Sequence, residues 1–407
     1  MRRNSIARII IGAAALTLLA SSMVAAQAPT PPPDPFGATL RTTVITNALD
    51  HAPTNELIEQ TAHDFHVDEL GGKANSSKKN GWFPVVPQPS TDGVTESVLD
   101  ASQRKNHLII ISGGDGQVDV GIAGNFQSTV FVDLGQQRPC VTESGQADPS
   151  GTCDGGVAGI PLNYSAVDFA VEDGAYLTGV LGAAASHDGR LGIISGTAEC
   201  NRCNRYIQGF VTGARSVDPD IDIELAYLAD DEVAGFGDPV SAKTFTEAFI
   251  DVYQPDVLLP VGRGATTGMI EAACESGDVL VVGTDIDVSA AHPDLAECLL
   301  TSVTTDIATA VRESMHAFAN GLMPPEVVYD LVNDRVAVTD EWKKRTLPVD
   351  TRERYKDAET GILTGQIDTC PLDCGAPFSL DGQGAGGEEA TTGDAGEGDT
   401  EEDDTGE

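Results

Sequence analysis

The chain has 407 residues, with 63 acidic and 24 basic side chains and a formal net charge of −39. A surface this acidic repels phosphate backbones, which excludes nucleic acid as an expected partner. Apolar residues make up 41% of the chain, enough for a sizeable core, and the length suits two domains with additional tails.

The N-terminus has the pattern of a secretory signal peptide. Arg2, Arg3 and Arg8 precede the apolar run 9–20, and small residues at 24–26 supply a cleavage site. A membrane anchor is the alternative, but the run is shorter than the ~20 residues that a bilayer span needs. No cysteine follows the run, so there is no lipobox. We therefore expect a secreted, periplasmic or cell-envelope protein, with residues 1–26 removed and a Pro-rich linker at 27–37.

The first half of the chain alternates between strand and helix patterns. Strands are predicted at 39–46, 108–111, 129–133 and 165–169, with a short one at Trp82, and helices at 55–65, 91–102 and 172–185. His63 and His66 lie three apart on a predicted helix and could ligate a metal, although a solvated helix face explains them as well. We predict no metal site. No phosphate-binding loop or dinucleotide fingerprint follows a predicted strand, so no cofactor is expected.

From residue 191 the alternation becomes regular. Strands are predicted at 191–194, 221–228, 257–260, 279–282 and 299–303, an extended segment at 327–336, and helices at 205–217, 241–253, 266–275 and 305–319. Alternation of this kind indicates an α/β fold, with parallel sheets covered by helices on both faces.

Six of the eight cysteines form three close pairs in the sequence, and Cys274 and Cys298 remain. In an exported protein this predicts four disulfides, Cys140–Cys153, Cys200–Cys203, Cys274–Cys298 and Cys370–Cys374. Cys200 and Cys203 also have the spacing of half a zinc site or of a redox motif. No second C-x-x-C is present to complete a four-thiolate zinc site.

Residues 256–287 form one strand–helix–strand unit whose polar residues follow the strands. Gly262-Arg263-Gly264 comes after the first strand, and Asp285 and Asp287 come after the second. In open α/β sheets, ligands bind outside the carboxyl ends of the strands. We therefore expect this stretch to form one wall of a binding cleft.

Between residues 163 and 303 a specific series of motifs occurs in order. They are NYSAVDFAVEDGAYLTG, GRLGIISG, RYIQGFVTGARSVDPDI, FGDP, PVGRGATTGMIEAA, VVGTDID and LLTSV. The series resembles the basic membrane protein family, which includes the PnrA-like purine nucleoside receptors of ABC importers. The resemblance implies a type I periplasmic-binding-protein fold, with two Rossmann-like lobes, three crossovers and a ligand between the lobes.

The resemblance also suggests how the chain divides. We expect an N-terminal lobe from 38–169 and 287–322, a C-terminal lobe from 170–286 and 323–346, and an extension at 347–374. Residues 375–407 are rich in Gly, Glu, Asp and Thr and are expected to be a disordered acidic tail. A role of the tail in calcium buffering or partner contact is the alternative to a merely solvated tail.

The resemblance carries over to individual residues. It implies that Phe236 stacks on a base, that Asp285 holds the ribose hydroxyls and that the turn Gly262, Arg263, Gly264 approaches the sugar. The remaining candidates for ligand contact are Asn55, Asp115, Asp119, Arg205, Tyr206 and Asp287. The alternatives are that Asp285 and Asp287 cap the next segment, that Phe236 packs at its turn, and that Arg205 pairs with a surface acid.

The sequence departs from the family pattern at three places. The loop after Gly196 carries the Cys200 and Cys203 pair directly before Arg205-Tyr206. The first helix opens with Ala52-Pro53-Thr54-Asn55 and lacks a second stacking aromatic. Thr304-Thr305-Asp306 stands where the family often has a lysine.

The resemblance implies a monomeric receptor that binds a nucleoside-like ligand and delivers it to the membrane permease of an ABC importer. We expect no enzymatic activity, because G-x-S-x-G and H-E-x-x-H are both absent. The alternatives are a ligand sensor without transport, a sugar-binding protein or an α/β enzyme.

Overall fold

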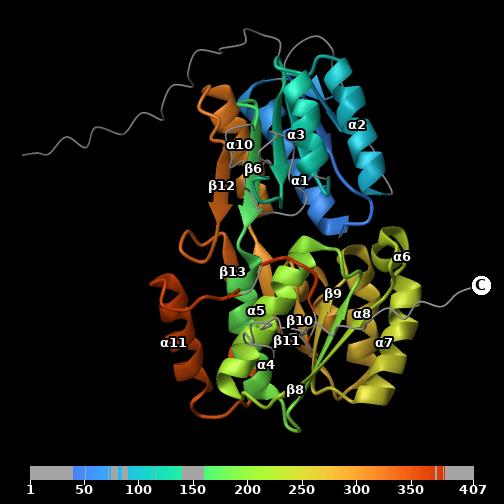
Figure 1. Cartoon of the computed structure of the whole chain (residues 1–407), viewed down its shortest axis with the longest axis vertical. Coiled ribbons are helices and arrows are strands. Elements are labelled where there is room, and N and C mark those ends of the chain that lie inside the picture. Colours follow the sequence, from blue (N-terminus) through green and yellow to red (C-terminus); the bar gives the residue numbers. More distant parts are fainter. Residues whose placement is uncertain are drawn as a thin grey trace, which may run out of the picture.

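Figure 1 shows the computed structural model, in which two α/β lobes lie one above the other. The structure describes residues 40–50, 52–71, 73–74, 81–84, 90–114, 116–139, 160–371, 374–378 and 380. Among these residues, no helix is long and apolar enough to cross a membrane. The expected signal peptide, the Pro-rich linker and the acidic tail beyond residue 380 lie outside the described residues.

The first lobe is built on a seven-stranded sheet with the order β12-β6-β5-β4-β1-β3-β2. Its strands are β1 (Arg41–Ile45), β2 (Lys73–Ala74), β3 (Gly81–Pro84), β4 (Leu108–Ser112), β5 (Val130–Leu134), β6 (Tyr164–Phe169) and β12 (Glu326–Tyr329). All neighbouring strands run parallel. The helices are α1 (Ala52–Asp64), continued by a π-helical turn (Phe65–Glu69), α2 (Thr91–Gln103), α3 (Gly116–Asn125) and α10 (Ile307–Ala319).

The second lobe is built on a six-stranded sheet with the order β13-β11-β10-β9-β7-β8. Its strands are β7 (Arg190–Ser195), β8 (Asp222–Tyr227), β9 (Val257–Val261), β10 (Leu280–Gly283), β11 (Leu299–Thr305) and β13 (Val336–Val338). Only the β11–β13 pair is antiparallel in this sheet. The helices are α4 (Val171–Ala185), α5 (Asn201–Val217), α6 (Glu232–Gly237), α7 (Pro239–Tyr253), α8 (Thr266–Ser276), α9 (Val288–Ala291) and α11 (Thr351–Leu363). The predicted α/β fold with two parallel-sheet lobes is confirmed.

The ends of the second lobe's helices follow local sequence rules. Helix α7 begins with Pro239, whose missing N–H is not needed in the first turn, and the side chain of Asp238 accepts hydrogen bonds from the next two backbone amides. Helix α8 ends at Gly277, which has a φ of 82°. Glycine adopts this left-handed conformation without steric cost, as predicted for the end of this helix.

Glycines allow helices α4 and α5 to touch backbone to backbone. A Cβ atom on Gly179 would lie 2.1 Å from the carbonyl oxygen of Phe210, and one on Gly213 would lie 2.0 Å from that of Tyr176. These separations are too short for any side chain. The contact fixes α5, which carries several of the residues described below, relative to α4 at the junction of the lobes.

The chain passes between the two sheets three times, after β6, after β11 and after β12. Two of the expected boundaries were therefore wrong. Strand β11 lies in the segment expected in the first lobe but pairs with β10 of the second lobe. Strand β12 was expected in the second lobe but pairs with β6 of the first. An apolar strand pattern predicts that a strand is buried, but it does not indicate the sheet to which the strand belongs.

Three of the four predicted disulfides are present, Cys200–Cys203, Cys274–Cys298 and Cys370–Cys374. The Cys140–Cys153 prediction lies outside the described residues. Because the sulfurs of Cys200 and Cys203 are bonded to each other, they are not a thiolate pair for zinc. Among the described residues, no group of His, Cys, Asp and Glu side chains has the arrangement of a metal site.

The expected C-terminal extension crosses back over the second lobe. Thr369 donates a hydrogen bond to Asp173 on α4, and the Asn204 side chain on α5 donates to the carbonyl oxygen of Gly375. Tyr227, at the end of β8, donates to the carbonyl oxygen of Phe378, whose ring is buried in the core. The extension therefore holds the N-terminal part of α5 in place. Gly375 and Phe378 fall within 375–407, which was expected to be a disordered tail, so the expected boundary of the tail at residue 375 is corrected.

Candidate ligand site between the lobes

The carboxyl ends of strands from both sheets meet between the lobes. Arg263, directly after β9, forms an ion pair with Asp50, in the loop after β1. Arg202, in the first turn of α5, lies against Gly135, directly after β5. Strand ends of this kind hold the ligands of open α/β sheets. The structure thus brings together the two strand ends that the sequence predicted for the second lobe, and places the first lobe opposite them (Figure 1).

Asp285 lies directly after β10 and is fixed by two neighbours on α5. Its Oδ1 atom accepts a hydrogen bond from Arg202 Nη2 at 2.5 Å and another from the hydroxyl of Tyr206 at 3.0 Å. Asp285 itself has a φ of 68°, which is unusual for a residue other than glycine. Strain of this size is usually kept where a side chain must point in one direction.

Burial and neighbouring charges keep Arg202 charged and Tyr206 protonated. Burial disfavours the charge on Arg202, but the carboxylate of Asp285 outweighs burial and the pKa of the guanidinium is raised. Burial, and then the Asp285 carboxylate, raise the pKa of Tyr206 well above its usual value. The Tyr206 hydroxyl therefore stays protonated and donates to Asp285 at neutral pH.

Arg263 occupies the second strand end. Its φ is 49°, and its guanidinium lies over the ring of Phe236, 5.1 Å from the ring centre. The ring also packs closely against Gly196, where a Cβ atom would lie 2.1 Å from it. Phe236 is only 3% exposed. The expectation that Phe236 offers an open face to a base is therefore corrected, because Arg263 covers that face.

The glycines beside Arg263 serve close contact with the first lobe. The amide of Gly264 donates a hydrogen bond to the carbonyl oxygen of Leu49 at 2.8 Å. A Cβ atom on Gly264 would lie 3.0 Å from that oxygen. The amide of Gly262 donates a hydrogen bond to the hydroxyl of Thr266, four residues further along the chain. Backbone approach was expected here, and the partner that approaches is the loop after β1.

Arg205 has a structural role. Its guanidinium donates to both carboxylate oxygens of Asp168, at 2.6 and 3.1 Å, and to both of Glu172, each at 2.9 Å. The Arg205 side chain is only 2% exposed. The prediction that Arg205 contacts a ligand is therefore corrected: it joins the end of β6 to α4 and α5, where the chain crosses between lobes.

The remaining candidates lie in different surroundings. Asn55 is buried and donates to the carbonyl oxygen of Asn47, so it shapes the loop after β1. Asp119 is completely buried in the first lobe, beside Gly114. Asp287 caps α9 by accepting from the amide of Ala290, which is the alternative that the sequence left open. Asp115 lies outside the described residues.

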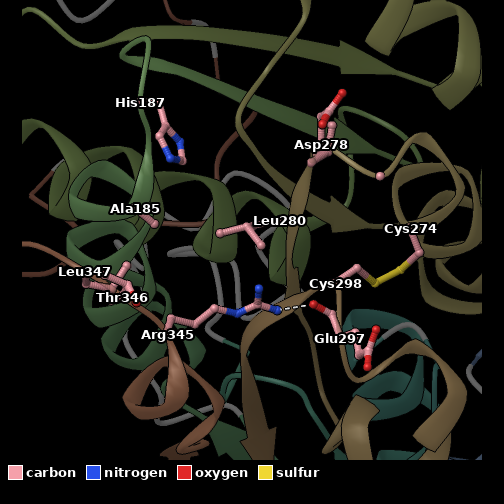
Figure 2. Close-up of a pocket in the computed structure, with 12 residues that line it drawn as sticks. Ala185, His187, Cys274, Asp278, Leu280, Glu297, Cys298, Arg345, Thr346 and Leu347 are labelled. Carbon is pink, nitrogen blue, oxygen red and sulfur yellow. Dashed lines mark hydrogen bonds between the residues drawn. A yellow bond between two sulfur atoms is a disulfide. The ribbon is translucent and has the colours of Figure 1, made fainter.

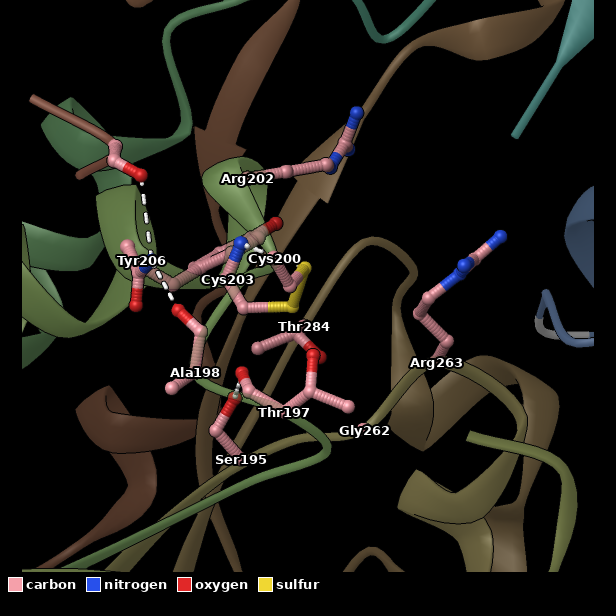
Figure 3. Close-up of a disulfide and its surroundings, with 12 residues drawn as sticks. Ser195, Thr197, Ala198, Cys200, Arg202, Cys203, Tyr206, Gly262, Arg263 and Thr284 are labelled. Atoms are coloured by element: carbon pink, nitrogen blue, oxygen red, sulfur yellow. Dashed lines mark hydrogen bonds between the residues drawn. A yellow bond between two sulfur atoms is a disulfide. The ribbon is translucent and has the colours of Figure 1, made fainter. Parts of the chain in front are cut away.

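The Cys200–Cys203 disulfide lies at this edge of the second lobe (Figure 3). Cys200 is the N-terminal cap of α5, and its sulfur accepts a hydrogen bond from the amide of Cys203 at 3.2 Å. Arg202 lies between the two cysteines in sequence, and Figure 3 shows its side chain and that of Arg263 extending in the same general direction above Thr197 and Thr284. The disulfide therefore closes the turn from which Arg202 projects.

Arg202 and Asp50 were not among the predicted site residues. A signal for Arg202 was present in its position between two cysteines, three residues before Arg205. Asp50 carries no comparable signal, because its partner Arg263 is 213 positions away.

A cavity of about 530 Å³ lies at the opposite end of the second sheet (Figure 2). It is lined by residues at the start of strands or just before them, including Leu280, Glu297 and Cys298. Arg345 also lines it and donates to the carbonyl oxygen of Leu299. Because ligands of such sheets bind at the carboxyl ends of strands, this cavity is not at the expected position.

Comparison with known proteins gives relatives by sequence. The family model described as ABC transporter substrate-binding protein PnrA-like matches residues 120–360. Basic membrane protein B of Borreliella burgdorferi is 32% identical over 153 residues, covering 37% of this chain and 42% of that protein. The ABC transporter nucleoside-binding protein BmpA of Lactococcus lactis is 26% identical over 220 residues, covering 50% and 60%. The chain thus spans about half the length of these curated relatives.

Solved structures share the fold. A solute-binding protein of an ABC transporter system from Aeropyrum pernix has a TM-score of 0.62 at 15% identity, over 82% of this chain and 94% of that one. A periplasmic solute-binding protein from Actinobacillus succinogenes with bound D-allose has a TM-score of 0.54 at 15% identity, over 78% and 100%. At these identities the likeness establishes the fold alone.

Proposed function

Because the chain belongs to the PnrA-like family of ABC transporter substrate-binding proteins, we propose that it binds a nucleoside-like solute between its lobes and delivers it to the permease of an importer. The family binds solutes outside the cytoplasm and is not a family of enzymes. What we propose for this chain is that the solute is nucleoside-like and that the chain delivers it to an importer.

The observation that carries the proposal is the fixed carboxylate of Asp285 at the interlobe end of β10. Arg202 and Tyr206 both donate to its Oδ1 atom. A carboxylate oxygen has further lone pairs, and a fixed carboxylate is suited to accept hydrogen bonds from the hydroxyls of a sugar. Preorganised acceptors of this kind fix the orientation of a small polar ligand.

The relatives support a nucleoside as the first class to test. The Lactococcus lactis relative is named a nucleoside-binding protein. The structure shows Phe236 covered by Arg263, so base stacking on this ring would require the guanidinium to move. The proposal therefore rests on hydrogen bonds from the sugar hydroxyls to Asp285, and other groups would contact the base.

Lobe closure is the step that would signal the bound state to a permease. The three crossovers after β6, β11 and β12 form the connection between the lobes. Thr91 of the first lobe donates to Glu232 of the second, and Arg263 pairs with Asp50. These contacts describe a closed arrangement, and a hinge of this type opens when they separate.

Isothermal titration calorimetry of the mature protein against nucleosides, free bases and pentoses tests the proposal. We expect at least one nucleoside to bind more tightly than its base or its pentose, and Asp285→Ala to weaken this binding by tenfold or more. Asp278→Ala, a change at the opposite end of the same sheet, is the control. If no compound in the panel binds at millimolar concentration, the nucleoside proposal fails.

A further inference from the structure

Two residues other than glycine adopt the left-handed conformation at neighbouring strand ends. Arg263 has a φ of 49° after β9, and Asp285 has a φ of 68° after β10. Arg263 is flanked by Gly262 and Gly264, yet the strained position itself carries a long charged side chain. Such strain persists where the direction of a side chain matters.

The guanidinium of Arg263 is held in a fixed orientation that suits the binding of an anion. It lies over the Phe236 ring, which keeps its plane in one orientation. Its Nε and Nη2 atoms donate to Oδ1 of Asp50 at 2.6 and 2.5 Å. The Arg263 side chain is 19% exposed and that of Asp50 is 16% exposed. A guanidinium fixed in this way suits a carboxylate or phosphate better than a neutral group.

Asp50 reaches Arg263 from the opposite lobe. It lies in the loop after β1, whereas Arg263 follows β9 in the second lobe. Arg202 differs, because its carboxylate partner, Asp285, belongs to the same lobe. When the lobes separate, Arg202 keeps Asp285 but Arg263 loses Asp50. The open second lobe then presents the Arg263 guanidinium to an incoming solute.

The two guanidinium groups approach neighbouring points of the first lobe. A Cβ atom on Gly113 would lie 2.8 Å from Arg263 Nη2, and one on Gly135 would lie 2.8 Å from Arg202 Nη1. These glycines directly follow Ser112 and Leu134, which are paired in β4 and β5. Neighbouring strands are about 5 Å apart, so the two guanidinium groups reach adjacent strand ends of the first lobe.

Two guanidinium groups at one place are unusual for the chain, which has 24 basic and 63 acidic residues, and each of them is paired here with a carboxylate. We propose, building on the solute-binding function above, that the natural ligand carries an acidic group, a carboxylate or a phosphate. Arg263 binds this group in the place that the Asp50 carboxylate occupies in this structure. Asp50 is then an internal competitor, which the ligand displaces from Arg263.

Pairs of compounds that differ only in an acidic group test the inference. We would titrate adenosine against adenosine 5′-monophosphate, guanosine against guanosine 5′-monophosphate, and glucose against glucuronate, by calorimetry at constant ionic strength. The expected result is that at least one acidic member binds ten times more tightly than its neutral partner. The phosphate and carboxylate pairs distinguish the two kinds of acid.

Variants at the two residues should shift this ratio in opposite directions. Arg263→Gln should abolish the preference for the acidic member, while Asp50→Asn should increase it, because the competing carboxylate is gone. Arg263→Lys keeps the charge without the planar donor group and should give an intermediate ratio. Arg190→Gln is the matched control, since Arg190 starts β7 and pairs with Asp188 far from the interlobe edge.

Two outcomes would overturn the inference. If neutral nucleosides bind as tightly as their phosphates, the inference is wrong and the nucleoside proposal stands. If neither member of any pair binds, both are wrong. Arg263→Gln could lose binding simply because it misfolds, so Asp50→Asn provides an independent test. The inference requires that Asp50→Asn raises the ratio of acidic to neutral ligand affinity. An unchanged ratio in this variant counts against the inference.

Discussion

The hydroxyl of Tyr206 donates a hydrogen bond to Oδ1 of Asp285 over 3.0 Å, although the two residues are 79 positions apart. The same hydroxyl accepts a hydrogen bond from the backbone amide of Asp285 at 3.2 Å. Tyr206 therefore holds both the side chain and the strained backbone of Asp285. Since Tyr206 is itself buried in the core beside α4, the packing of α5 determines where this carboxylate points.

Replacing Tyr206 with Phe removes this hydroxyl and leaves the ring. We expect affinity for the tightest-binding nucleoside to fall about fivefold, corresponding to the ~1 kcal/mol of a typical hydrogen bond, because Asp285 loses one of its two α5 donors. The melting temperature should change little. Calorimetry measures the affinity, and Tyr253→Phe, on the exposed face of α7, is the control. Equal affinities of Tyr206→Phe and the parent would show that Arg202 alone positions Asp285.

Replacing Arg205 with Met should destabilise the fold without changing ligand affinity per folded molecule. The change leaves the carboxylates of Asp168 and Glu172 buried without their partner. Removing one partner of a buried ion pair costs about 3–5 kcal/mol, which urea unfolding would measure. Arg104→Met removes an exposed pair with Asp100 and should cost less than about 0.5 kcal/mol.

A second variant tests whether the lost stability comes from unpaired charges or from lost packing. Combining Arg205→Met with Asp168→Asn and Glu172→Gln removes the unpaired charges and should recover most of the lost stability. If the triple variant is as unstable as Arg205→Met alone, the cost does not come from the two carboxylates. If Arg205→Met folds normally but no longer binds ligand, the original expectation of a ligand contact regains support.

The sequence predicted the parts of the site that depend on local pattern. Asp285 and Arg263 could be placed at strand ends because apolar runs and glycines mark where a strand stops. The partners of these two residues, Asp50 for Arg263 and Arg202 for Asp285, could not be predicted, since ion pairs between segments far apart in sequence depend on how the chain folds. The prediction for Phe236 failed for the same reason: a motif identifies the ring but not the guanidinium that covers it.

The C-terminal helix shows another limit of sequence patterns. Helix α11 was predicted only as part of an extension, because its sequence TRERYKDAETGIL is largely polar. Few of its side chains are buried, among them Ala358 and Ile362, which pack against α4 in a small cluster of their own. A helix that packs against another helix through so narrow an apolar stripe has a weak hydrophobic periodicity in its sequence.

Replacing Gly213 with Ala should destabilise the protein strongly. The added methyl group would lie 2.0 Å from the carbonyl oxygen of Tyr176, so α4 and α5 would have to move apart. We expect a loss of at least about 2 kcal/mol in urea unfolding, the range of overpacked cores, and weaker ligand binding because α5 carries Arg202 and Tyr206. Gly121→Ala is the matched control: no atom lies within 4 Å of its Cβ position in α3. This change should stabilise by up to ~1 kcal/mol, and equal effects at both sites would refute the close α4–α5 contact.

Asp173 should make stability depend on pH. Burial raises its pKa from 3.8 to about 6, although the hydrogen bond from Thr369 and the charge of Arg205 oppose the rise, and Glu172 and Asp330 add to it. Because the folded-state pKa lies above the unfolded one, ionised Asp173 destabilises the fold above pH 6, and this cost disappears as the pH falls toward 4. Its upper limit is roughly 3 kcal/mol for about two pKa units.

Asp173→Asn removes the charge and keeps an acceptor for Thr369. The variant should therefore be more stable than the parent at pH 7.5, by about 1–2 kcal/mol after allowing for partial solvent exposure, and the difference should shrink to near zero at pH 4. Urea unfolding of both proteins at each pH measures the difference, which cancels the titration of the other acidic groups. Asp357→Asn, at an exposed position of α11, is the matched control. A constant difference for Asp173→Asn would mean that Asp173 ionises in the folded protein as it does in the unfolded chain.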